Sequence, residues 1–300
     1  MHELKIDFTP LLGKFEIASR KGVSGSQAGA GAHARSTGER KAVLFRGKGL
    51  EFEKFREFTH DDDASMIDWK ASLRSKKLMV KTYSEEQNKD VIFLFDVSNS
   101  MAYSSTGKLK SEYGAEVVSS LGYAIAESGD NLGLVMFNES VAAYLPPTSG
   151  INQYMRMKKF LSDPKHYDGK FDFVKVIKQL MNLVKRPAIL VIVSDFIGLK
   201  GDWKRSLEAA AGKFEMIGIM VRDPLDNDLP EVSGQVVVSD PFSQDELLIE
   251  PKRIGKAYKS VSQKIMKDVK LSFQSTQSDF IILNTGESFV RPLRRLFLGG

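Results

Sequence analysis

The stretch Val91-Ile92-Phe93-Leu94-Phe95-Asp96-Val97-Ser98-Asn99-Ser100-Met101 decides the fold. Its first five residues are apolar, and they lead directly into an acidic residue. Such a short apolar run is typical of a central strand in a parallel sheet, because that strand is buried on both faces. Ligands of open α/β sheets bind just beyond the carboxyl ends of the strands. We therefore expect Asp96, Ser98 and Ser100 to lie together on one loop at that edge.

Strand and helix patterns alternate from residue 78 onward. The expected strands cover residues 78–83, 91–95, 132–137, 141–145, 188–193, 214–221, 235–238, 246–249 and 280–283. The expected helices lie near residues 109–127, 152–161, 173–184, 203–211 and 258–273, with a last one through 294–295. Alternation of this kind predicts an α/β fold, with a mostly parallel sheet and helices on both faces.

The chain divides into two expected parts. Residues 1–85 form a β-rich N-terminal segment, in which the small residues of 22–38 predict a mobile loop. Residues 86–300 form the α/β domain.

Composition narrows the function classes. The 300 residues carry a net charge of +5, but the basic residues are mixed with acidic ones, which argues against a nucleic-acid partner. With no cysteine, the chain has neither disulfides nor a zinc–thiolate site. No apolar stretch approaches the ~18 residues of a membrane span, and the first residues lack a signal-peptide pattern. We expect a cytoplasmic protein.

A second acidic residue ends another apolar strand, at Asp195. Neighbouring parallel strands would bring Asp195 to the same edge as Asp96, Ser98 and Ser100. Two carboxylates and two hydroxyls are hard oxygen ligands, which suit Mg²⁺ or Mn²⁺. The alternative is that both aspartates only cap the helices that follow them.

At these residues the chain resembles the von Willebrand factor A-type domain. The metal-ion-dependent adhesion site of that family has an Asp-x-Ser-x-Ser loop, a later Thr and a later Asp. Asp96, Ser98 and Ser100 match the loop, and Asp195 matches the last element. Phe171 or Lys170 stands where the Thr is expected, and a phenyl ring cannot ligate an ion. The resemblance therefore implies a degenerate site that binds its Mg²⁺ or Mn²⁺ weakly.

A more specific resemblance lies upstream, in a signature region at residues 46–81. The signature residues are Arg46, Glu51, Arg56, Asp62, Asp63, Asp68, Trp69 and Arg74. They are similar to those of the bacterial family numbered fifty-eight among domains of unknown function, in which the signature also runs into an Asp loop.

The acidic residues of this region allow two interpretations. The four carboxylates are Asp61, Asp62, Asp63 and Asp68. They could hold metal ions, as in a metal-dependent phosphoesterase or nuclease. Alternatively, the last three pair with arginines of the signature and, with a buried Trp69, fold this segment onto the sheet. The arginines concerned are Arg46, Arg56 and Arg74. We favour the second interpretation.

The predicted function is binding and not catalysis, because no Ser/His/Asp set or pair of catalytic glutamates presents itself. A Mg²⁺ or Mn²⁺ ion at the Asp96 loop would keep one coordination position open for a partner's carboxylate. The family resemblance implies the partner, because members of that family accompany MoxR-type AAA+ ATPases. The expected partner is such an ATPase or its client.

Overall fold

The computed structural model describes residues 6, 50–59, 62–85, 88–243 and 245–298. They fall into two compact units, a smaller one within residues 46–88 and a larger one that contains residues 89–298. The loop expected at 22–38, Arg46 and Asp61 lie outside the described residues.

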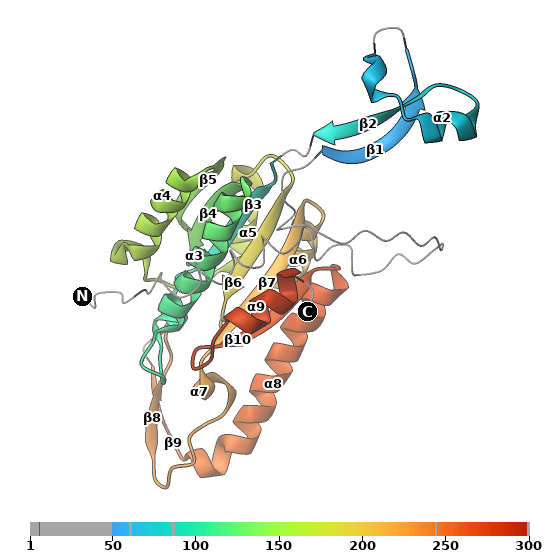
Figure 1. The fold of residues 1–300 in the computed structure, drawn as a ribbon. Helices are drawn as coiled ribbons and strands as arrows, with labels where there is room; N and C mark the ends of the chain where they lie inside the picture. Colours follow the sequence, from blue (N-terminus) through green and yellow to red (C-terminus); the bar gives the residue numbers. More distant parts are fainter. Residues whose placement is uncertain (1–5, 7–49, 60–61, 86–87, 244, 299–300) are drawn as a thin grey trace. The chain divides into compact units, whose positions relative to one another are not determined.

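A six-stranded sheet forms the centre of the larger unit, with the strand order β10-β7-β6-β3-β4-β5 (Figure 1). Its strands are β3 (Asp90–Asp96), β4 (Asn131–Phe137), β5 (Val141–Ser149), β6 (Ala188–Ser194), β7 (Phe214–Arg222) and β10 (Asp279–Asn284). Strand β5 pairs antiparallel with β4, and the other pairs are parallel. The expected α/β class, with a mostly parallel sheet, is confirmed.

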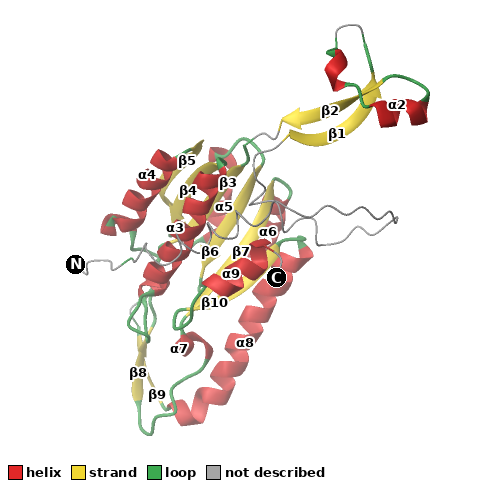
Figure 2. Ribbon diagram, viewed as in Figure 1, coloured by secondary structure: helices red, strands yellow, loops and turns green. Residues whose placement is uncertain are grey.

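Helices cover both faces of this sheet (Figure 2). One core contains residues of α3 (Lys110–Ser128), α4 (Ile151–Ser162) and α9 (Val290–Leu298). The other contains residues of α5 (Phe173–Leu183), α6 (Trp203–Ala211) and α8 (Pro251–Ser275). Successive side chains of a strand point to opposite faces, so Phe93 joins the first core and Leu94 the second. Burial on both faces explains the uninterrupted apolar run of β3.

Shorter elements complete the larger unit. They are the 3-10 turns η3 (Asn99–Ala102) and η4 (Pro164–His166), the short helix α7 (Pro224–Asn227), and the antiparallel strands β8 (Val236–Ser239) and β9 (Glu246–Ile249). No helix among the described residues is long and apolar enough to cross a membrane.

The smaller unit is an antiparallel strand pair, β1 (Leu50–Glu57) and β2 (Met79–Glu85). Two short elements lie between these strands, the 3-10 turn η2 (Ala64–Met66) and the helix α2 (Trp69–Ser75). The Asp68 carboxylate accepts the amide of Ala71 at 2.9 Å and so caps α2. Asp63 caps η2 in the same way through the amide of Ser65.

The expectation of a buried Trp69 was wrong, because this side chain is 65% exposed. Trp69 is the first residue of α2. One strand pair and one seven-residue helix offer too little apolar surface to enclose an indole ring.

The cap at Asp68 gives a testable expectation. Asp68→Ala should destabilise α2 by about 1 kcal/mol, since an amide of its first turn loses its acceptor. Asp68→Asn keeps a capping oxygen and should retain most of the stability. Hydrogen exchange at the amides of α2 measures both variants. If the α2 amides exchange as fast in Asp68→Asn as in Asp68→Ala, the negative charge of Asp68 stabilises the helix and its capping hydrogen bond does not.

Candidate functional site

Two neighbouring central strands position the predicted metal ligands. Phe95 of β3 lies opposite Val193 of β6 in the parallel register. Asp96 therefore ends β3 beside the point where Ser194 ends β6, and Asp195 is the next residue. The carboxyl ends of two strands thus bring together side chains that lie about a hundred residues apart in the sequence.

The four predicted residues are joined by a chain of hydrogen bonds. The Ser98 amide donates to Asp96 Oδ1 at 2.9 Å. The hydroxyl oxygens of Ser98 and Ser100 lie 3.2 Å apart, and the Ser100 hydroxyl donates to Asp195 Oδ1 at 3.1 Å. None of the four residues is more than 2% exposed. The structure therefore gathers them into one enclosed polar site.

The Asp96 carboxylate is fully enclosed, and its only hydrogen-bond donors in the described structure are neutral. The Ser194 hydroxyl donates to its Oδ2 at 2.5 Å. Burial, followed by the negative charge of Asp195, raises the pKa of Asp96 to about 7, although the bonds from Ser194 and Ser98 act in the opposite direction. The ionised form of Asp96 would therefore be a buried charge without a cationic partner among the described residues.

A lysine that the sequence analysis did not single out compensates the second carboxylate. Lys110, the first residue of α3, is 1% exposed. Its ammonium lies 2.7 Å from Asp195 Oδ2 and 2.9 Å from Asp226 Oδ2. Burial alone would lower the pKa of Lys110, but these two carboxylates raise it overall. Lys110 is therefore a buried cation.

A third strand end adds to the same network. Asp223 follows β7, and its Oδ2 accepts the amide of Ser105 at 2.7 Å. Its own amide donates to Asp226 Oδ2 at 3.0 Å. Burial would raise the pKa of Asp223, but the hydrogen bonds from Ser105 and Leu225 lower it overall.

Only part of this network leaves a signal in the sequence. Asp223 follows an apolar strand, as Asp96 and Asp195 do, and the same reasoning could have found it. Lys110 could not be found in that way, because a lysine at the start of a helix is ordinarily a solvated surface residue.

The oxygens of this site fit a divalent cation. Serine hydroxyls and carboxylates are the ligand type that Mg²⁺ and Mn²⁺ prefer, and the raised pKa of Asp96 indicates a shortage of positive charge. Asp96, Ser98, Ser100 and the Oδ1 atom of Asp195 would hold the ion, since Asp195 Oδ2 already contacts Lys110. Among the described residues, no group of three or more His, Cys, Asp or Glu side chains could hold a metal ion. Binding would therefore depend on the two serines.

Phe171 lies in an apolar cluster and offers no ligand. Its ring centroid is 5.9 Å from that of Phe137 and 6.4 Å from that of Phe173. The loop that precedes Phe171 is nevertheless held beside the site, because Gly169 and Asn99 exchange two hydrogen bonds of 2.9 Å. Gly169 has a φ of +108°, which other residues rarely adopt.

The acidic residues of the smaller unit have separate partners. Asp62 pairs with the two terminal guanidinium nitrogens of Arg56 and accepts the Thr59 amide at 2.8 Å, and the bond to Arg56 is the main cause of its lowered pKa. Asp63 and Asp68 cap η2 and α2. Within the described part of the chain, Arg74 takes part in no ion pair. Glu51 lies on β1, opposite Ser84 of β2.

The enclosed Asp96 predicts a pH dependence of stability. The folded chain keeps this proton up to about pH 7, whereas the unfolded chain releases it near pH 3.8. The folded state therefore binds more protons in this window, and the free energy of unfolding falls as the pH rises. The asparagine of Asp96→Asn has no proton to release. In this variant the free energy of unfolding should therefore fall less steeply with pH, by up to about 1.4 kcal/mol per pH unit. Urea unfolding in EDTA at several pH values measures the free energy of unfolding of wild type and of Asp96→Asn. Identical pH profiles for these two proteins would contradict the prediction.

Comparison with known proteins identifies the family. Residues 54–267 match the family model described as "Protein of unknown function DUF58". The chain is 26% identical over 199 residues to a Mycobacterium tuberculosis protein, Rv1480, and to a Mycobacterium bovis protein, Mb1516. Each alignment covers 66% of this chain, and the chain spans 62% of the length of these curated relatives.

Solved structures with a related arrangement have low identity to this chain. BatB from Bacteroides thetaiotaomicron is 17% identical, with a TM-score of 0.46 and coverage of 68% of this chain and 93% of that one. An aerotolerance-related membrane protein from Bacteroides fragilis is 15% identical, with a TM-score of 0.49 and coverage of 71% and 100%. A von Willebrand factor type A protein from Catenulispora acidiphila is 17% identical, with a TM-score of 0.32 and coverage of 48% and 35%. Likeness at this level says nothing about function.

The family match spans more than half of the chain, which therefore belongs to the DUF58 family.

Proposed function

We propose that this DUF58 protein is a non-enzymatic, divalent-metal-dependent protein-binding protein. In this proposal a Mg²⁺ or Mn²⁺ ion binds at Asp96, Ser98, Ser100 and Asp195, in a degenerate adhesion site of the von Willebrand factor A type. The observation that supports it most is the chain of hydrogen bonds that joins these four residues and ends at the enclosed carboxyl group of Asp96.

The charges around the site favour a cation there. The buried carboxylates of Asp195 and Asp226 share one lysine, Lys110, whereas the buried Asp96 pairs with no cation among the described residues. A buried carboxylate without a counter-charge is costly, so a bound cation would relieve an unfavourable state. The ion would supply positive charge that attracts a partner's carboxylate.

The proposed partner is a MoxR-type AAA+ ATPase or its client. Because the four side chains are at most 2% exposed, a partner's carboxylate can reach the ion only if a loop at this edge moves. Ion and partner would then bind cooperatively, each raising the affinity for the other. The proposed location is the cytoplasm, where an ATP-driven partner has its nucleotide.

Metal binding can be measured without a partner. Calorimetry with Mg²⁺ and with Mn²⁺ should show one weak site in the wild-type chain. Ser98→Ala should abolish it, because this substitution removes a ligand oxygen. Ser272→Ala is the matched control, since the Ser272 hydroxyl donates to the Asp268 carbonyl within α8, and this variant should bind metal like wild type. If wild type binds neither ion, the site is a structural polar cluster.

Partner binding can be tested with a purified MoxR-type AAA+ ATPase from the same organism. A pull-down in Mg²⁺ should retain the ATPase, and excess EDTA or Ser98→Ala should release it. Ser272→Ala should retain it. Undiminished retention in EDTA would show that the ion has no part in recognition.

A further inference from the structure

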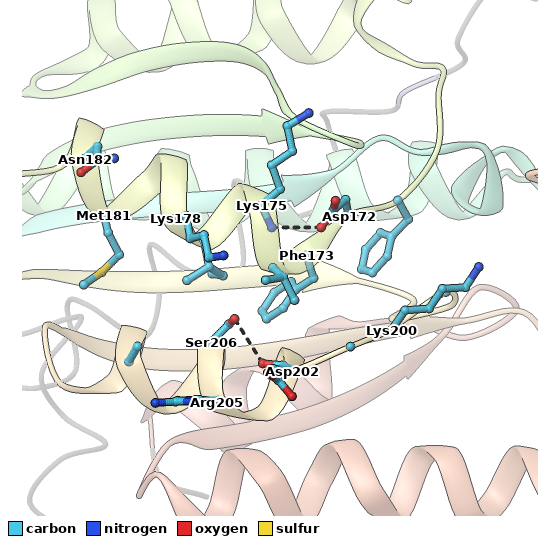
Figure 3. A pocket seen from close by; sticks show the side chains of 16 residues that line it. Asp172, Phe173, Lys175, Lys178, Met181, Asn182, Lys200, Asp202, Arg205 and Ser206 are labelled. Carbon is cyan, nitrogen blue, oxygen red and sulfur yellow. Dashed lines mark hydrogen bonds between the residues drawn. The ribbon is translucent and has the colours of Figure 1, made fainter.

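A groove of about 1070 Å³ lies between α5 and α6 on the surface of the larger unit (Figure 3). Residues of the stretches 171–182 and 198–209 line it. The α6 positions recur at helical spacing, at 202, 205, 206 and 209, so the groove follows one face of this helix. At ~1.5 Å per residue the two helices run for roughly 13–16 Å, which is about three turns of a third helix.

The groove has an apolar floor between two basic walls. Val174 and Met181 of α5 contribute its accessible apolar surface, above the buried Phe173. In Figure 3, Lys178 on α5 and Arg205 on α6 lie on opposite sides, and the side chain of Met181 points from α5 toward α6.

The basic side chains of the walls have no internal counter-ion. Both Lys178 and Arg205 are exposed, and neither takes part in an ion pair with any described residue. Other lysines beside the groove do have internal partners. Lys204 of α6 pairs with Asp268 of α8, and Lys213 donates to the Met181 carbonyl at 3.0 Å.

The acidic residues of the groove lie at one end of it. Asp172 and Asp202 are the N-cap residues of α5 and α6, and Asp172 accepts the Lys175 amide at 2.9 Å. In Figure 3 the Lys175 side chain extends away from α6. A free anion at the helix N-termini would therefore meet carboxylates. The positive charge is accessible along the middle of the groove, at Lys178 and Arg205.

We propose that this groove binds an acidic amphipathic helix of a protein partner. The apolar stripe of that helix would cover Val174 and Met181, and acidic side chains on both of its edges would face Lys178 and Arg205. Binding of a helix in a groove of this kind combines apolar burial with charge complementarity. The inference rests on the proposed function only in taking the partner to be a protein.

The test uses a labelled synthetic peptide of about 18 residues, long enough to form a helix, with a leucine stripe flanked by glutamates. A scrambled peptide of the same composition keeps the charge and loses the stripe. Fluorescence anisotropy with the full chain should show binding of the first peptide and at least about tenfold weaker binding of the second.

Charge-reversal variants locate the site. Lys178→Glu combined with Arg205→Glu should weaken binding at least about tenfold, because two attractions become repulsions. Lys264→Glu combined with Lys267→Glu, on the exposed side of α8, makes the same change in net charge and should stay within about twofold of wild type. Met181→Gln should also weaken binding, whereas Met155→Gln on the opposite face of the sheet should not.

Four results would overturn the proposal: no binding of the amphipathic peptide, equal binding of the scrambled peptide, equal loss in both double variants, or self-association of the chain that only the groove variant removes. The last result would make a second copy of the chain the occupant. Ser98→Ala separates this inference from the proposed function, because it should leave peptide binding unchanged while it abolishes metal binding.

Discussion

The ion pair between Lys110 and Asp195 is the interaction on which the carboxyl edge of the sheet depends. Both side chains are at most 1% exposed, and a carboxylate in such a position would cost several kcal/mol without a counter-charge. The same ammonium contacts Asp226 in α7. One cation therefore joins the start of α3, the end of β6 and the segment after β7. Packing alone would leave the charges at these strand ends uncompensated.

This arrangement divides the two strand-end carboxylates into different roles. Asp195 is engaged on both oxygens, by Lys110 and by the Ser100 hydroxyl and Ile197 amide. Among the described residues, the hydrogen-bond donors to Asp96 are neutral groups of Ser194 and Ser98. Hydrogen bonds from neutral donors offset only part of the cost of burying a charge. Asp195 therefore stabilises the fold, and Asp96 is the carboxylate whose environment would change most when a cation binds.

The sheet could be predicted from the sequence because its strands are buried on both faces and so read as unbroken apolar runs. The strand-end residues Asp96 and Asp195 followed from those runs. Lys110 could not be predicted, since its burial depends on carboxylates more than eighty residues away. Trp69 was misplaced because burial of an aromatic residue depends on how much apolar surface its unit assembles, and the smaller unit assembles little. The groove between α5 and α6 also escapes sequence reasoning, as its two walls come from separate helices.

One short segment, Ser194 to Phe196, connects the buried site to Phe173 of the groove. Phe196 has a φ of +56°, a conformation that is costly for a residue with a bulky side chain. It is held there by burial, by the bond from its amide to the Ser194 hydroxyl at 2.8 Å, and by ring contacts with Phe173 and Phe273. Ser194 also donates to Asp96, and Phe173 lines the groove. A change at Asp96 that displaced Ser194 would therefore release a strained residue packed against the floor of the groove. The two sites can influence each other only through such a second conformation of this segment, because close-packed side chains do not transmit gradual shifts.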